Sequence, residues 1–199
     1  MATQAEIVAK WLSHRKMSNP LTVPLTMTGG GRIYRHYYVP AGAFRKQGAA
    51  DPDQGWEGLY ETQDFDAAAE QSLYWNVNLP YRWDSDADFN VHIFWLHDAN
   101  AADANKYVRW GVEYKSVAAG EAVAGVGATI HKNQAGLNTT QGLLILTNFT
   151  EAIANAALAT HDQLGIRFFR DATVDDMPGD ARIIEVHFEF IMDKLGEPV

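Results

Sequence analysis

Apolar and polar side chains alternate along several segments of the chain after residue 31. The pattern is clearest in residues 107–115, YVRWGVEYK, whose apolar side consists of Val108, Trp110, Val112 and Tyr114. A period of two is what a β-strand with one face on a hydrophobic core requires. We therefore expect Trp110 and its three neighbours to be core residues, and Trp110 not to be a platform for a ligand.

Eight segments of this kind are expected to be strands, and they are rich in β-branched and aromatic residues. They are residues 33–39, 73–79, 89–96, 107–115, 125–131, 142–149, 163–169 and 181–192. The connections are long, and the first is a loop rich in Gly, Ala and Asp. This organisation predicts an all-β fold for residues 32–199, an antiparallel double-sheet β-sandwich of the jelly-roll type.

Residues 1–31 differ in character and are expected to form an extended N-terminal arm. Pro20, Pro24 and the glycines at 29–31 oppose regular structure, after a short amphipathic stretch that presents Ile7, Trp11 and Leu12 on one side. This segment has too little apolar surface to fold alone, so we expect it to pack on a neighbouring subunit or a partner protein.

Two later segments are rich in alanine. By propensity, residues 65–71 and 150–159 could form helix, and their alanines could equally serve as small loop residues. Both alternatives remain open from the sequence.

Composition narrows the classes of function. The chain has 199 residues and no cysteine, so disulfides, thiolate metal sites and cysteine nucleophiles are excluded. The formal net charge of -9 disfavours nucleic acid as a partner. No apolar run approaches the ~20 residues of a membrane helix or forms a signal-peptide core, so we expect no membrane partner and synthesis in a cytoplasm.

Two acidic clusters are candidates for binding a hard cation such as calcium. The first comprises Asp51, Asp53 and Glu57, and the second Asp84, Asp86 and Asp88. Alternate carboxylates in a loop can converge on calcium, but neither cluster matches an EF-hand loop. The favoured interpretation is that these aspartates cap turns. In the turn RDATVDDMPGD, Arg170 is expected to pair with Asp175, Asp176 or Asp180 and so brace the last two strands.

The sequence shows no catalytic signature. A GxSxG elbow, a P-loop and a GxGxxG motif are absent, and no two of the seven histidines have a metal-binding HxH or HExxH spacing. His92 and His187 fall on the polar phases of expected strands. We expect a protein that is not an enzyme, with no catalytic residue, cofactor or metal site.

Three segments resemble a known family. They are WNVNLPYRWDSDADFNVHIFW, YVRWGVEYKSVAAGE and LGIRFFRDATVDDMPGDARIIEVHFEF. Together they are similar to a jelly-roll β-sandwich found in poorly characterised structural proteins of tailed bacteriophages, over roughly residues 72–192. The chain departs from that pattern at Met177, where the family tends to have Thr, and the first 70 residues carry no part of it. The resemblance implies a virion protein that is made in the host cytoplasm and is oligomeric.

The first functional hypothesis is a virion structural protein, a capsid decoration or a head or tail appendage. Whichever phase of residues 33–39 faces inward, tyrosine remains on the other face, and Ile183 and Ile191 lie out of phase with the other apolar residues of their strand. Such residues suit a subunit interface. The expected interface residues are Ile7, Trp11, Leu12, Tyr34 and Tyr38. The resemblance favours a homotrimer over a dimer, with other virion proteins such as the major capsid protein as partners.

The alternative hypothesis is a carbohydrate-binding or glycan-processing jelly roll, in which one of the acidic clusters would bind calcium. Exposed aromatic residues in loops would stack on sugar rings, and the candidates are Trp56, Tyr60, Tyr81 and Trp83.

Overall fold

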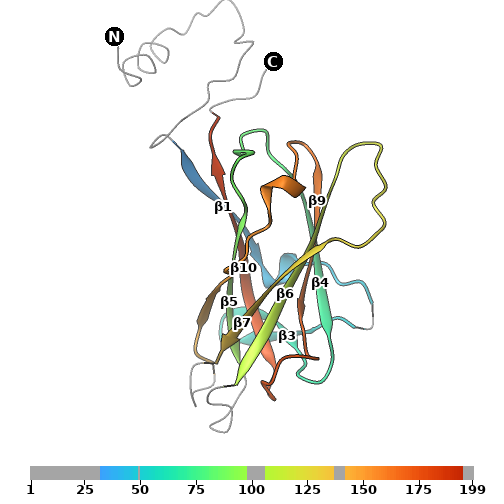
Figure 1. Ribbon diagram of the computed structural model, residues 1–199. Coiled ribbons are helices and arrows are strands. Elements are labelled where there is room, and N and C mark those ends of the chain that lie inside the picture. The colour runs from blue at the N-terminus through green and yellow to red at the C-terminus, as the bar shows by residue number, and fades with distance from the viewer. Residues whose placement is uncertain (1–31, 49, 98–105, 137–141, 195–199) are drawn as a thin grey trace, which may run out of the picture.

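The computed structural model describes residues 32–48, 50–97, 106–136 and 142–194, which form two antiparallel sheets packed face to face (Figure 1). The larger sheet consists of β1 (Ile33–Pro40), β2 (Asp53–Glu57), β3 (Tyr60–Phe65), β5 (Asn90–His97), β8 (Ile145–Asn148) and β10 (Ala181–Met192). The smaller sheet consists of β4 (Gln71–Asn78), β6 (Tyr107–Val117), β7 (Ala128–Ala135) and β9 (Gln163–Arg170). Two short 3-10 turns, η2 (Ala41–Ala43) and η4 (Asn155–Ala157), lie in connections.

The order of strand pairing defines the fold. β6 pairs with β7, β5 with β8, β4 with β9 and β1 with β10, each pair antiparallel. These pairs are nested around the connection between β6 and β7, as in one long hairpin that rolls over on itself. The result is two sheets in the orders β2-β3-β10-β5-β8, with β1 also beside β10, and β4-β9-β6-β7. This is the double Greek key of a jelly roll, so the predicted fold class is confirmed.

The core between the sheets is built around aromatic rings. Trp95 of β5 and Trp110 of β6 are fully buried and meet edge to face, with ring centroids 5.5 Å apart. Phe65 and Phe168 lie 5.4 Å and 5.2 Å from the Trp110 ring. The prediction that Trp110 and its apolar neighbours on β6 face the core is confirmed.

The hairpin of β2 and β3 lies where the sequence analysis predicts a loop, and that prediction is wrong. Asp53 pairs with Asp64, and Glu57 pairs with Tyr60, around a turn in which Gly58 has a φ of +60°. Thr62 is the only β-branched residue in the two strands, so propensity gives little indication of them.

Neither alanine-rich segment forms an α-helix. Residues 65–71 leave β3 through a turn in which the Asp66 N–H donates to Oε1 of Gln71 at 2.7 Å. Residues 150–159 contain only the 3-10 turn η4. Alanine favours helix locally, but these segments have no apolar stripe of period 3.6 that a helix could bury.

β10 changes the phase of its alternation at an irregularity in register between Ile183 and Glu185. Ala181 and Ile183 face the core before it, and Val186 and Phe188 face the core after it. The expectation that Ile183 lies out of phase with the core residues of this strand is therefore wrong, because a β-bulge inserts one residue and reverses the alternation.

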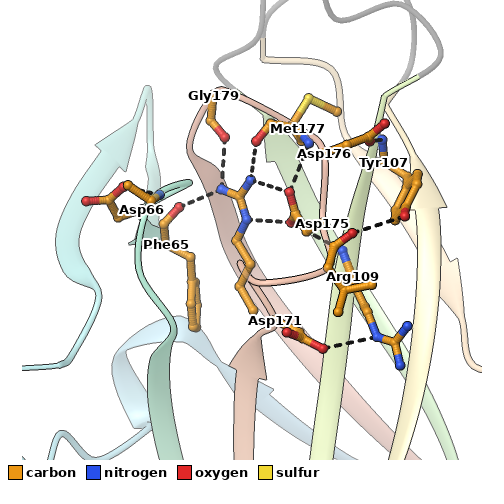
Figure 2. A network of polar contacts seen from close by, with 12 residues as sticks. Phe65, Asp66, Tyr107, Arg109, Asp171, Asp175, Asp176, Met177 and Gly179 are labelled. Atoms are coloured by element: carbon orange, nitrogen blue, oxygen red, sulfur yellow. Dashed lines mark hydrogen bonds and ion pairs between the residues drawn. The ribbon is translucent and has the colours of Figure 1, made fainter.

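A buried polar network joins the two sheets at the end of β9 (Figure 2). Arg170 is fully buried, and its Nε and Nη2 donate to the two carboxylate oxygens of Asp175 at 2.7 Å and 2.9 Å. Nη1 donates to the carbonyls of Phe65 and Gly179, and Nη2 also donates to the carbonyl of Met177. All five N–H groups of the guanidinium therefore have acceptors. The predicted pairing of Arg170 within this turn is confirmed, with Asp175 as the partner.

The same turn is fixed to β6. Asp176 accepts a hydrogen bond from the Tyr107 N–H at 2.7 Å, and Asp171 pairs with Arg109 at 3.2 Å (Figure 2). The aspartates of this connection thus hold backbone and side chains of the neighbouring strand.

Candidate functional site

The outer face of the six-stranded sheet carries exposed tyrosines. Tyr34 and Tyr38 of β1 are 60% and 61% exposed, whereas Val39 is buried and Tyr37 packs against the core. The prediction that tyrosine remains on the outer face of this strand is therefore confirmed.

Strand register brings histidines beside these tyrosines. Tyr38 lies opposite His187, and His187 lies opposite His92, so the three residues form one row across β1, β10 and β5. The ring of His187 is 4.6 Å from Tyr38 and 4.7 Å from Phe94, and His36 is 5.8 Å from His187. We call the set Tyr34, His36, Tyr38, His92, Phe94 and His187 the histidine–tyrosine face.

Polar groups on the same face contact the imidazoles. His187 lies 3.1 Å from Oε2 of Glu185, and His36 lies 3.4 Å from Oε2 of Glu189. Nδ1 of His92 is 2.7 Å from Oδ1 of Asn148 on β8. The rings are thus oriented in the isolated chain, which lowers the entropic cost of binding through this face.

Exposed apolar side chains concentrate on the same sheet. Of the twelve large hydrophobic residues that the described part of the chain exposes, nine lie on its strands or on the connections at its edge. These nine are Ile33, Tyr34, Tyr38, Trp56, Leu59, Tyr60, Leu143, Leu144 and Leu146. The other three are valines in loops: Val123, Val126 and Val174. Exposed large hydrophobic residues are therefore concentrated on the strands and edges of the six-stranded sheet.

A hollow of about 460 Å³ continues the histidine–tyrosine face toward the β2–β3 turn. Phe94 and His187 line it together with Tyr60, Leu144 and Ile184. Ile184 reaches this outer side because the irregularity in β10 reverses the alternation. The apolar surface therefore extends beyond the strands that carry the tyrosines.

Hydrogen bonds and an ion pair engage carboxylates of both acidic clusters. Asp51 accepts hydrogen bonds from the backbone N–H groups of Gln47 and Gly48, and Asp88 accepts one from Asn155. Asp84 forms an ion pair with Arg32. Within residues 32–48, 50–97, 106–136 and 142–194, no group of three or more His, Asp or Glu side chains could hold a metal ion. The favoured interpretation, that these aspartates cap turns, is confirmed for Asp51 and for Asp84, which accepts the Asp86 N–H at 3.0 Å.

The four aromatic candidates for sugar stacking do not form one platform. Trp83 is fully buried, and its Nε1 donates to the carbonyl of Ala87 at 2.9 Å, so its expected exposure is wrong. Tyr81 is half-buried with its ring 5.9 Å from that of His161.

Trp56 and Tyr60 are exposed, at 65% and 62%, but they lie in strands rather than loops. Trp56 pairs with Glu61 and Tyr60 pairs with the next residue along β2, Glu57. The two rings therefore point to opposite faces of the hairpin.

A second hollow lies on the outer face of the four-stranded sheet, and the sequence analysis did not find it. Register places Tyr74, Arg167 and Glu113 in one row across β4, β9 and β6. The next row is Asn76, Gly165 and Lys115. The only signal in the sequence was the polar phase of three alternating strands, which does not reveal which residues become neighbours.

This hollow has a volume of about 450 Å³, and a second one of about 420 Å³ adjoins it. Gln47, Tyr74 and Arg167 line both. We call the two hollows together the polar groove.

Of the expected interface residues, Ile7, Trp11 and Leu12 lie outside the described residues, as does the whole expected arm, residues 1–31. The described ranges contain no helix long and apolar enough to cross a membrane.

No protein-family model matches the chain, and no curated protein matches it. Among solved structures, it is similar to the CBM36-1 domain of a multidomain xylanase from the hindgut metagenome of Trinervitermes trinervoides, with 11% identity over 77% of this chain and 96% of that one and a TM-score of 0.42. The carbohydrate-binding module TmCBM27 matches with 10% identity over 80% of this chain and 98% of that one and a TM-score of 0.43.

A structure of infectious bursal disease virus, Gt strain, matches with 11% identity over 89% of this chain and a TM-score of 0.41. This chain spans 40% of that viral chain. At these TM-scores the similarities indicate no ligand or partner for this chain. The assignment of the jelly-roll fold is based on the strand order of the chain itself.

Proposed function

We propose that this protein is a non-enzymatic structural component of a bacteriophage virion, either a capsid decoration or part of a head or tail appendage. It assembles as a closed homo-oligomer through the histidine–tyrosine face. The observation that carries the proposal is the concentration of exposed aromatic and aliphatic side chains on one sheet, while the outer side of the opposite sheet carries charged side chains such as Glu113, Lys115 and Arg167.

The composition of the face suits a protein partner. Tyrosine and phenylalanine are enriched at the centres of interfaces, where lysine and glutamate are depleted. Glu185 and Glu189 of β10 lie among these side chains, 3.1 Å from His187 and 3.4 Å from His36, so both carboxylates have partners within the face. The exposed tyrosine and leucine side chains of this sheet are covered when subunits associate.

Residues 1–31 supply a second contact in this proposal. Ile7, Trp11 and Leu12 pack on a neighbouring subunit or on another virion protein such as the major capsid protein. The phage-family resemblance of the sequence supports both the virion assignment and a trimer in preference to a dimer.

A reconstruction of the particle by electron cryomicroscopy tests the proposal. The expected result is density for the jelly roll at defined symmetry positions, with Tyr34 and Tyr38 buried against a neighbouring subunit. Absence of the protein from purified particles, or a position in which this face contacts only solvent, would contradict it.

A further inference from the structure

We infer that the polar groove on the four-stranded sheet binds a neutral oligosaccharide or polysaccharide. This inference concerns the sheet opposite the proposed subunit interface and does not depend on the assembly role.

The side chains of the groove are held in fixed positions. Nε of Arg167 donates to the Ser72 hydroxyl at 2.8 Å, and its Nη1 donates to Glu113 at 3.3 Å. Nη2 donates to Glu70. Burial lowers the pKa of Arg167, but the hydrogen bonds that its guanidinium donates to Glu70 and Glu113 more than offset this, so the pKa is raised and the guanidinium stays charged. A recognition site held in this way loses little side-chain entropy when a ligand binds.

The floor beneath Arg167 is also rigid. Its guanidinium lies 4.5 Å above the ring of Phe169, which is almost fully buried although it belongs to the outer side of β9. Phe169 lies flat over Gly111, where any added Cβ would collide with the ring. The ring of His131 is perpendicular to that of Phe169, with the two centroids 5.8 Å apart.

The loop beside the groove is fixed by Lys115. Its ammonium donates to the carbonyls of Ala122 and Ala124 at 3.0 Å and 2.7 Å, and Glu113 accepts the Gly127 N–H at 3.0 Å. The loop that forms one wall is thus attached to the sheet that forms the floor.

Gly165 gives the groove its depth. It sits between Asn76 and Lys115 in the sheet, and a Cβ built on it would meet only the Lys115 carbonyl oxygen, at 3.8 Å. Glycine is therefore not required there by crowding or by its backbone conformation. It leaves open the space that a larger side chain would fill.

Charge identifies a neutral ligand. The groove is lined by three cations and three carboxylates, so their charges cancel. They are Arg45, Lys115 and Arg167, and Asp51, Glu70 and Glu113. A site for a phosphate or a uronate would carry an excess of cations.

The mixture of groups matches sugar hydroxyls, which both donate and accept hydrogen bonds. Gln47 and Asn76 offer amide donors and acceptors, and Arg45 offers donors only. The half-buried ring of Tyr74 provides an apolar surface with a polar tip, suited to the C–H face of a sugar. Each hollow has the volume of an ordinary ligand site, 300–1,000 Å³ by a rough survey range.

A peptide strand does not fit beside Tyr74. The Arg45 N–H donates to the Tyr74 carbonyl at 2.7 Å, and the Tyr74 N–H donates to the Arg45 carbonyl at 2.9 Å. The backbone at this edge of β4 is therefore already paired, and strand addition is blocked at this point.

Affinity electrophoresis of the full chain tests the inference. Native gels contain one soluble polysaccharide each: dextran, galactomannan, arabinoxylan or mixed-linkage β-glucan as neutral probes, and polygalacturonate or alginate as acidic ones. Retardation by at least one neutral polysaccharide is expected. Retardation in none of the neutral gels, or only in the acidic gels, would overturn the inference.

Three variants locate the site. Gly165→Val adds a side chain to the floor at a position where a Cβ meets only the Lys115 carbonyl oxygen, at 3.8 Å. It is expected to abolish retardation while the melting temperature is unchanged or higher, because valine favours strand. Arg45→Ala and Tyr74→Ala are each expected to raise the apparent Kd roughly tenfold, which corresponds to about 1.4 kcal/mol.

Tyr38→Ala, on the opposite sheet, is the matched control and is expected to bind as the unmodified protein does. Full retardation of a folded Gly165→Val protein would place the binding site elsewhere. Loss of retardation in Tyr38→Ala would show that binding depends on the assembly face, whereas failure of assembly with intact retardation would contradict only the proposed function.

Discussion

The guanidinium of Arg170 is fully buried and is held by the carboxylate of Asp175 through two hydrogen bonds, at 2.7 Å and 2.9 Å. Arg170 belongs to the four-stranded sheet, and it also binds the carbonyl of Phe65 at the end of a strand in the other sheet. The ion pair therefore fixes both the turn before β10 and the relative position of the two sheets at this end of the sandwich.

Asp175→Ala is expected to destabilise the protein by about 3–5 kcal/mol, because it leaves a buried guanidinium without its counter-ion. Urea denaturation measures the change. The matched control is Asp176→Ala in the same turn, whose side chain is 40% exposed. It is expected to lose about 1 kcal/mol, the usual contribution of one hydrogen bond. Equal effects of the two variants would show that the buried ion pair has no special role.

Trp110→Ala is expected to lower the free energy of unfolding by about 3–5 kcal/mol, because the ring is fully buried against Phe65, Trp95 and Phe168 and its removal leaves a cavity. Trp56→Ala, at an exposed position, is expected to change it by about 0.5 kcal/mol or less. A stable Trp110→Ala protein would place this ring outside the core.

Asp64 gives a prediction about pH. Burial raises the pKa of its carboxyl, and Asp180 and Asp53, which lies directly opposite, add to the effect, although Thr62 and Arg182 oppose it. The folded state therefore holds this proton more tightly than the unfolded chain. The protonated Asp64 carboxyl therefore contributes to the free energy of unfolding at pH values below its ordinary pKa, about 4. This contribution is lost as the pH rises through the raised pKa of the folded state.

Asp64→Asn replaces the carboxyl with a group that does not ionise, so the variant does not lose this stability as the pH rises. The variant is expected to be more stable than the unmodified protein at neutral pH, by less than about 1 kcal/mol because the side chain is partly solvated. The difference should disappear below about pH 4. Thermal denaturation at neutral and acidic pH measures it, and a variant that is less stable at neutral pH would show that the ion pair with Arg182 outweighs burial.

The sequence predicted the parts of the fold that local patterning controls. Alternation placed Trp110 in the core and left Tyr34 and Tyr38 outside, and turn chemistry linked Arg170 to the aspartates that follow it. These features depend on the spacing of residues within one segment. In a β-strand that spacing decides directly which side chains share a face.

Features that depend on register between distant strands could not be predicted. The row of Tyr38, His187 and His92 joins three segments, and a shift of one residue would separate them. Burial of Trp83 likewise depends on a bridge to Met192, which is more than one hundred positions away in sequence. The outer sides of the strands carried polar patterns, but only the pairing order shows which of their residues meet.

Deletion of residues 1–31 tests the proposed arm. The truncated protein is expected to keep the melting temperature of the full chain within a few degrees, because the jelly roll of the described residues contains its own core. Its incorporation into particles or oligomers is expected to fall. Sedimentation measures assembly and calorimetry measures stability. Unchanged assembly of the truncated protein would show that residues 1–31 have no role in assembly.

The histidine–tyrosine face as a subunit interface is the central claim, and light scattering of the purified full chain at micromolar concentration tests it most directly. The expected mass is a closed multiple of the 22.1 kDa chain, and a trimer is favoured. Tyr34→Glu combined with Tyr38→Glu places two charges on the face at exposed positions and is expected to give a folded monomer. Gly165→Val, on the opposite sheet, should leave the mass of the oligomer unchanged. A monomeric unmodified protein, or an oligomer that the two glutamates leave intact, would contradict the claim.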